Sequence, residues 1–245
     1  MWLLLRFIIT KKDDLIKNLN VFKPFKSALI AFCFLASMAP SHCLAQIDDV
    51  GLWIGVTLQS NVTRKLEGSF TEQLRLSNDI TRINLLLSDL GLDYSINKQL
   101  KVGLHYRFIN SNKDNYYSKR HRFYADIAWK EKVKFISFTL RERIQEQFSD
   151  YYSSETGKIP EWVLRSKLTA KIDLDKKYSP YVSIEMFYLI DNVKEETGIT
   201  DFRYETGFNY EFNRIHSVNP YLLCQITRST NFIELIYGVS YSYSF

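Results

Sequence analysis

The last ten residues, Ile236–Phe245, read IYGVSYSYSF and alternate between two kinds of side chain. Large apolar or aromatic residues occupy every second position, and glycine or serine occupies most of the positions between them. Successive side chains of a β-strand point to opposite faces of the sheet. The stretch therefore predicts a strand with one apolar, aromatic face and one small, polar face, as in the closing strand of a transmembrane β-barrel.

The same period of two recurs along the chain. Residues 100–108 set Leu, Val, Leu, Tyr and Phe on one face against Lys, Gly, His and Arg on the other. Similar alternation is found in residues 122–129, 136–143, 162–172, 181–188, 202–212 and 221–227. Polar connections join these segments, and they alternate between short turns and longer loops. The pattern predicts an all-β fold, an antiparallel up-and-down transmembrane β-barrel.

The expected strand number is about ten, with twelve as the alternative, because a bacterial barrel with both ends in the periplasm needs an even number. Residues 50–59 would run in the wrong direction to pair antiparallel with the last strand. The ten-strand version places them outside the wall, and the twelve-strand version divides residues 80–96 into two strands. Within residues 80–96 the apolar residues change from one face of the strand to the other between Leu87 and Leu90, which indicates a β-bulge.

The beginning of the chain does not share the alternation. Basic residues up to Lys26 precede the short apolar run 28–36, and small side chains follow within residues 43–45. That order is typical of a secretory signal peptide, and the run is shorter than the roughly 20 residues of a membrane-spanning helix. We expect a signal peptide with an over-long start over residues 1–45, followed by a single outer-membrane barrel domain over residues 46–245.

Charge and aromatic content are consistent with an exported membrane protein. The first 45 residues carry six of the 32 Lys and Arg and two of the 27 Asp and Glu, which leaves the rest of the chain with a net charge of +1. This balance argues against a nucleic-acid partner. Trp53, Trp129 and Trp162 are expected at the membrane–water interface, where such rings are favoured. The expected partners are outer-membrane lipid and, during biogenesis, the barrel-assembly machinery.

Two sets of residues are candidate sites. Charges gather on the faces opposite the apolar ones, and the predicted lumen charge network comprises Arg75, Arg107, Arg122, Asp126, Arg141, Arg143, Arg165, Glu185, Arg203 and Glu205. Charges confined in a narrow barrel are expected to pair. The favoured interpretation is a salt-bridge network that fills the lumen, and the alternative is a small pore whose arginines pass anions. The predicted C-terminal assembly signal is formed by Tyr241, Tyr243 and Phe245.

The residues give little indication of catalysis. Beyond the predicted leader the histidines are His105, His121 and His216, and the chain has neither a Gly-x-Ser-x-Gly nor a His-Glu-x-x-His motif. We interpret His105, beside Arg107, as a structural hydrogen-bonding residue, and predict no enzyme, no cofactor and no metal site. The alternatives are an outer-membrane lipid-modifying enzyme and a soluble periplasmic lipid-binding β-barrel, in which the apolar faces would point inward.

A set of residues in a fixed order also carries a family resemblance. They are Trp53, Glu72–Arg75, Tyr106–Arg107, Arg122 with Asp126, Arg141 with Arg143, Arg165, Pro180–Tyr181 with Glu185, and Arg203 with Gly207. Over about residues 47–245 the chain resembles a family of small predicted outer-membrane β-barrel proteins of Gram-negative bacteria, catalogued as a domain of unknown function. The resemblance implies a barrel in the outer membrane and no particular activity. The expected role is a structural barrel or narrow, porin-like channel with a charge-paired lumen.

Overall fold

The computed structural model describes residues 47–113, 115–149, 160–173, 177–191 and 197–245. All of them belong to one unit, Gln46–Phe245. The predicted signal peptide lies outside the described residues. No helix in the described part of the chain is long and apolar enough to cross a membrane.

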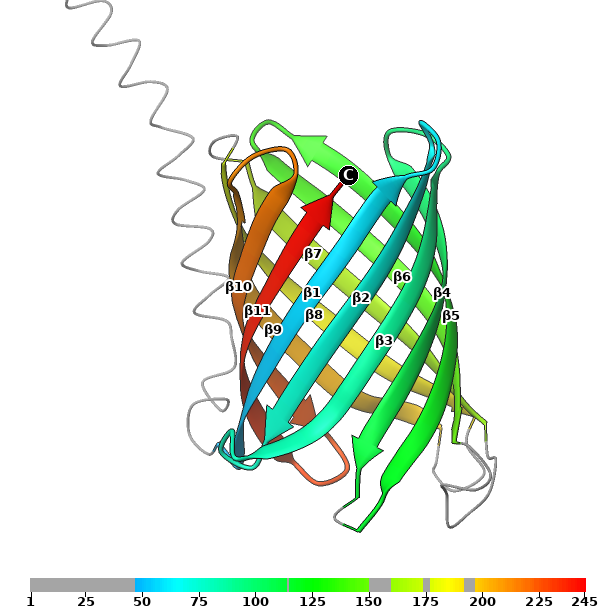
Figure 1. Cartoon of the computed structure of the whole chain (residues 1–245), viewed down its shortest axis with the longest axis vertical. Helices are drawn as coiled ribbons and strands as arrows, with labels where there is room; N and C mark the ends of the chain where they lie inside the picture. The colour runs from blue at the N-terminus through cyan, green and yellow to red at the C-terminus, as the bar shows by residue number, and fades with distance from the viewer. Residues whose placement is uncertain (1–46, 114, 150–159, 174–176, 192–196) are drawn as a thin grey trace, which may run out of the picture. The chain divides into compact units, whose positions relative to one another are not determined.

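The described residues form eleven β-strands (Figure 1). In chain order they are β1 (Asp49–Asn61), β2 (Leu66–Ser77), β3 (Arg82–Ser95), β4 (Leu100–Asn112), β5 (Tyr117–Val133), β6 (Ile136–Ser149), β7 (Glu161–Ile172), β8 (Tyr178–Asp191), β9 (Gly198–Glu211), β10 (His216–Thr227) and β11 (Phe232–Ser244). The shortest have 12 residues, whereas a tilted strand needs about 9–11 to cross a bilayer. Every strand is therefore long enough to span a membrane.

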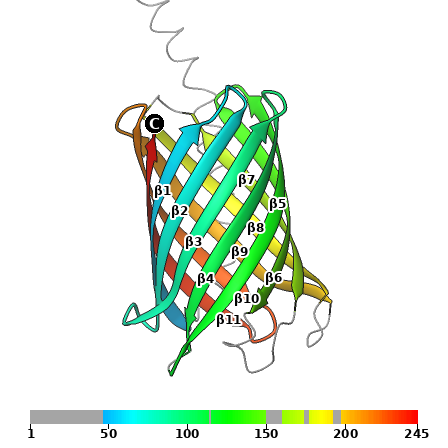
Figure 2. The ribbon, with the colours of Figure 1, turned by 45° about the vertical axis from the view of Figure 1, so that its right-hand side comes forward.

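The strands close into a barrel in which consecutive strands of the chain pair with each other and the first strand pairs with the last (Figures 1 and 2). Pairs between consecutive strands are antiparallel, from β1–β2 through to β10–β11. The closing pair, β1 with β11, is parallel, and its register places Trp53 beside Gly238 and Gln59 beside Ser244. A parallel ladder leaves no open strand edge, so the sheet satisfies its backbone hydrogen bonds around the whole circumference.

The parallel closure corrects the expected strand number. Ten strands and twelve strands are both wrong for the described residues, which contain eleven. Residues 50–59 do run in the same direction as the last strand, but they belong to the wall as part of β1. Consecutive antiparallel strands alternate in direction, so an odd number leaves the first and last strands parallel. The expectation of an even number assumed that the closing pair must be antiparallel.

The predicted β-bulge occurs, but at a different place. The register between β2 and β3 shifts where Arg75 pairs with Leu85 and Leu76 pairs with Ile83, so that one residue of β3 has no partner. Between Leu87 and Leu90 the strand is regular. Leu87 faces the lumen and is only 3% exposed, so an inward-facing apolar residue, rather than a bulge, produced the apparent switch of phase.

The two rims of the barrel differ in their connections. At one rim β1, β3, β5, β7, β9 and β11 end, with the turns 62–65, 96–99, 134–135 and 212–215 (Figure 1). At the other rim β2, β4, β6, β8 and β10 end, with the turns 78–81 and 228–231, and β1 begins there. We call them the C-terminal rim and the loop rim. The two longest intervals between consecutive strands follow β6 and β8, which both end at the loop rim.

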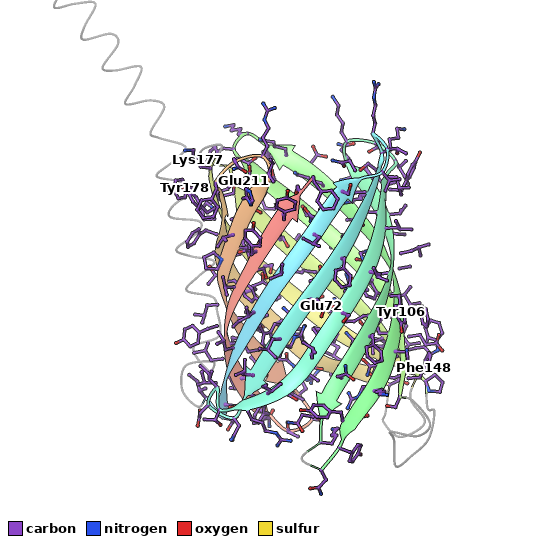
Figure 3. All side chains as sticks on the ribbon, in the orientation of Figure 1. Glu72, Tyr106, Phe148, Lys177, Tyr178 and Glu211 are labelled. Carbon is purple, nitrogen blue, oxygen red and sulfur yellow. The ribbon has the colours of Figure 1, made fainter. Side chains whose placement is uncertain are left out.

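Apolar side chains cover the outside of the barrel. Leu90, Leu104 and Ile127 are 54%, 68% and 56% exposed, whereas Arg143 and Glu185, on the inner face, are 7% and 4% exposed. This distribution is the reverse of that in a water-soluble protein. It supports the expectation that the apolar faces look outward around a charged interior. Figure 3 shows the side chains that project from the wall.

The lumen also contains two small apolar clusters. Trp53, Leu223 and Ile236 form the first, with Tyr221 packed against it, where β1, β10 and β11 meet. The second comprises Val163, Phe187 and Leu189 from β7 and β8. Trp53 is only 8% exposed, so its expected place at the membrane–water interface is wrong. Its position opposite inward-facing Gly238 and Arg75 directs its ring into the barrel.

Candidate functional site

One side of the lumen, on β3 to β6, pairs arginine with carboxylate. Arg107 Nε donates to Asp89 at 2.6 Å, and the Tyr124 hydroxyl donates to the same carboxylate at 2.6 Å. Arg143 donates to both oxygens of Asp126, at 2.7 and 2.6 Å, in a bidentate pair. The Arg143 guanidinium also lies 3.8 Å from the centre of the Tyr124 ring. Charge-assisted bonds of this geometry are among the strongest side-chain interactions.

His105 lies in the same region, between two carboxylates. Its Nδ1 is 3.5 Å from Asp89 and its Nε2 is 3.7 Å from Asp93. The ring stacks on Tyr124, with centroids 4.6 Å apart and planes 4° apart. A side chain at Gly91 would collide with the His105 ring. This enclosed position fits a structural role, and among the described residues no hydroxyl group forms a hydrogen bond to His105.

A second set of ion pairs lies on β6 to β9. Glu185 accepts from Arg165 Nη2 at 2.8 Å and from Arg141 Nη2 at 2.5 Å. Lys167 pairs with Glu205 at 2.9 Å, and Glu205 also accepts from the Tyr181 hydroxyl at 2.7 Å. The pairs connect neighbouring and next-neighbouring strands, so they brace the wall from within.

Three arginines have amide partners instead. Arg75 Nε donates to Gln73 at 2.9 Å, and Arg203 Nε donates to Gln225 at 2.9 Å. Arg122 donates to Gln147 through Nε at 3.0 Å and also through Nη2. A glutamine side chain carries no charge, so these hydrogen bonds orient the guanidinium groups without neutralising them. We call Arg75, Arg122 and Arg203 the amide-held arginines.

Aromatic rings lie beside several of these guanidinium groups. Arg75 and Arg203 lie 3.6 and 5.3 Å from the centre of the Trp53 ring. Arg203 is also 4.6 Å from the Phe187 ring, and Arg165 lies 4.3 Å from that ring. Cation–π attraction to a ring face favours a guanidinium in such a position. Trp53 thus brings Arg75 from β2 and Arg203 from β9 together across the closing pair of strands.

All ten residues of the predicted lumen charge network lie on inner-face positions of the barrel. They do not form one network. Arg107, Asp126 and Arg143 belong to the pairs on β3 to β6, and Arg141, Arg165, Glu185 and Glu205 belong to those on β6 to β9. The remaining three are the amide-held arginines.

Sequence reasoning missed Asp89, Tyr124 and the three glutamine partners. Gln73 could have been found, because it lies two residues before Arg75 and therefore on the same face of the strand. Gln147 and Gln225 lie on the strands next to their arginines, so finding them needs the register. Asp89 was missed because residues 80–96 were interpreted with the bulge in the wrong place.

The predicted C-terminal signal residues lie on the outer face. Tyr243 and Phe245 have ring centroids 5.6 Å apart, and the Tyr243 ring also contacts His216 at 5.2 Å. The Tyr241 hydroxyl forms a hydrogen bond with His216 Nδ1. His216 is the first residue of β10. These residues form an aromatic patch at the C-terminal rim.

A second outer patch lies near the loop rim, where Figure 3 labels Tyr106 and Phe148. The Tyr106 hydroxyl forms a hydrogen bond of 2.8 Å with His121 Nδ1, and His121 stacks on Phe148 with centroids 5.5 Å apart. Tyr178 and Tyr210, 4.8 Å apart, lie near the opposite rim. Aromatic residues toward both ends of an outer wall are typical of a barrel that meets two interfaces.

The described residues contain no group of three or more His, Cys, Asp or Glu placed to hold a metal ion. The fold and the interior together define the class of protein, a closed β-barrel of the outer-membrane type with a charged lumen. Residues 50–234 match the family described as "Protein of unknown function (DUF2490)". The chain belongs to this family, which confirms the resemblance to a domain of unknown function.

Several solved barrels are partly similar to the chain. LpxR from Salmonella typhimurium has a TM-score of 0.48 at 8% identity, covering 73% of this chain and 83% of that one. A NanC porin has a TM-score of 0.47 at 11% identity, covering 76% and 90%. Outer-membrane expressed OmpT of Vibrio cholerae has a TM-score of 0.39 at 8% identity, covering 66% and 54%. No curated protein matches the sequence.

Proposed function

We propose that the protein is an integral barrel of the outer membrane whose ion-paired lumen makes it a structural barrel or a narrow channel. The observation that carries this proposal is the inverted distribution of side chains, with leucine and isoleucine outside and arginine–carboxylate pairs inside. Exposing so much apolar surface to water would be unfavourable. A lipid bilayer removes that cost, and a closed barrel is one of the two folds that can span it.

Electrophoretic mobility of the membrane fraction tests the membrane assignment. A folded outer-membrane barrel resists SDS until heated, so unboiled and boiled samples should migrate differently. The substitution Leu104→Lys places a charge on the most exposed outer leucine and should destabilise the inserted barrel by about 2–4 kcal/mol if the site lies near the bilayer midplane. Leu104→Ala is the matched control. Recovery of the protein in the soluble periplasmic fraction, with one mobility in both samples, would contradict the proposal.

Single-channel recording in planar bilayers then separates a conducting lumen from a closed one. Replacing Arg141 and Arg143 by Ala removes two large side chains from the inner face and should enlarge the conductance of a narrow channel. A barrel closed by its ion pairs gives no current before or after the change.

We also propose that the lumen has no catalytic role. The support is the position of His105, whose two ring nitrogens face Asp89 and Asp93. If the alternative of a lipid-modifying enzyme holds, His105→Ala should abolish a modification of lipopolysaccharide or phospholipid seen by mass spectrometry. Unchanged lipid profiles in the wild type and in this variant agree with the non-enzymatic role.

Barrel-assembly machinery and outer-membrane lipid are the proposed partners, and the C-terminal strand is the proposed recognition element. Phe245 is 67% exposed at the end of the outer aromatic patch, so it is accessible to a partner. Removing Phe245 should reduce the amount of heat-modifiable protein in the membrane, whereas Ser244→Ala should not. Equal amounts in both variants would remove Phe245 from the proposed signal.

A further inference from the structure

The amide-held arginines lie close enough to act on one another. The positive charges of Arg203, Arg107 and Arg122 all bear on Arg75, and Arg122 faces Arg107 directly in the register between β4 and β5. Like charges in this arrangement repel. Arg107 pairs with Asp89, whereas Arg75, Arg122 and Arg203 donate only to amide oxygens within the part of the chain that the structure describes. The barrel therefore concentrates positive charge at this level of the lumen.

Among the residues that the structure describes, no ion pair within 4.0 Å joins Arg75, Arg122 or Arg203 to a carboxylate. The positive charges of Arg75 and Arg203 act on the Glu234 carboxyl. No ion pair within 4.0 Å joins Glu234 to either arginine among the described residues. Asp201 accepts from the Gln225 amide nitrogen at 3.1 Å and so orients the glutamine rather than the arginine.

The donors of Arg75 and Arg203 are also only partly used. Each bonds its glutamine through Nε, and no hydrogen bond to their Nη1 or Nη2 is found within the described residues. The described residues contain four buried side-chain polar atoms without a hydrogen-bond partner, and none of them belongs to Arg75 or Arg203. The Nη1 and Nη2 atoms of these two arginines are therefore accessible from the lumen. Two guanidinium groups beside the same indole ring thus present free, charged N–H donors. Guanidinium groups of this kind recognise carboxylate, phosphate and sulfate.

We propose that the lumen holds a binding site for a small oxyanion, a carboxylate, phosphate or sulfate, formed by Arg75 and Arg203 beside Trp53. The inference rests on the proposed function, because the ligand reaches the site through the lumen of a folded barrel. It adds the chemical class of the solute. The glutamine partners hold the guanidinium groups in place while leaving their charge for the ligand.

Calorimetric titration of the detergent-solubilised protein, isolated from membranes, tests the site. The probes are inorganic phosphate, sulfate and acetate, with ionic strength held constant by sodium chloride. Saturable binding of at least one oxyanion is expected. The double variant Arg75→Gln and Arg203→Gln should weaken it by at least about tenfold, since each lost charge-assisted contact contributes to affinity.

The matched control is the double variant Arg141→Gln and Lys101→Gln. It removes the same charge from the inner face, but Glu185 keeps Arg165 as a partner, and Lys101 lies 3.5 Å from Asp93, away from Trp53. Affinity in this variant should stay within about twofold of the wild type, because it loses only long-range attraction. The tightest of the three probes identifies the class of oxyanion.

Two results would overturn the site. One is the absence of saturable binding for all three probes, and the other is equal loss in the two double variants. Heat-dependent mobility of the same preparation separates this failure from that of the proposed function. A heat-modifiable barrel that binds no oxyanion contradicts the site alone, whereas a protein without heat-dependent mobility contradicts the outer-membrane barrel itself.

Discussion

The lumen holds its arginines in two different ways, and the difference separates structural charge from available charge. On β3 to β6, Arg107 and Arg143 donate to Asp89 and Asp126, so their charges are neutralised. Beside Trp53, Arg75 and Arg203 donate to glutamines, which do not compensate their positive charge. Burying an ion is costly unless it is paired, so the second arrangement needs water or an anion in the lumen to stabilise it. The two regions should therefore respond differently to the same substitution.

The largest effect is expected from breaking the bidentate pair. Arg143→Gln leaves the Asp126 carboxylate without its partner in a site where Asp126 is 9% exposed. Removing one partner of a buried pair typically costs about 3–5 kcal/mol. Urea titration of the protein in lipid vesicles, followed by tryptophan fluorescence, measures the change. Adding Asp126→Asn to this variant should recover a large part of the loss, and no recovery would mean that packing rather than charge dominates.

A smaller loss of stability is expected from a substitution in the barrel wall beside Trp53. A Cβ at Gly238 would lie 2.0 Å from Cζ of Tyr221, which packs on the Trp53 cluster. Gly238→Ala forces the Tyr221 ring to move and should destabilise the barrel by about 1–3 kcal/mol. The same urea titration measures it, and adding Tyr221→Ala relieves the collision. If the double variant is no more stable than expected from adding the two single effects, the collision is not the cause.

Replacing an amide-held arginine should cost little stability. Arg75→Gln leaves behind only Gln73, a neutral partner, and removes one cation–π contact with Trp53. The expected loss is about 1 kcal/mol or less. A loss as large as that of Arg143→Gln, in the same titration, would remove the distinction between the two regions.

The smallest effect is expected at the C-terminal rim. Lys132 Nζ donates to Asp173 at 2.6 Å, and this hydrogen bond lowers the pKa of the Asp173 carboxyl. A lowered pKa in the folded state stabilises the barrel above the unfolded carboxyl pKa of about 3.9, and the contribution disappears as the pH falls through the lower folded value. Because Lys132 is exposed, Lys132→Ala should cost only a few tenths of a kcal/mol at neutral pH. A pH series of the urea titration measures the difference, which should vanish at the acidic end.

The alternation of residue types determined the strands and the composition of their two faces, because side-chain direction in a strand depends only on position within it. It led to Arg107, Arg143 and Glu185 as inner-face residues before any contact was known. Alternation could not decide which face looks outward, since a soluble barrel uses the same pattern. That was decided by closure, which left Leu104 and Ile127 exposed and Arg143 buried.

The tertiary structure alone decided the parallel closure and the partner of each arginine. Arg143 and Arg203 look alike in the sequence, each an inward residue of a strand that also carries acids. Their partners, Asp126 and Gln225, are set by the register of neighbouring strands, 17 and 22 residues away in the chain. Register is a property of pairing between strands rather than of any one strand, so whether a charge is neutralised or left open to the lumen follows only once the barrel has closed.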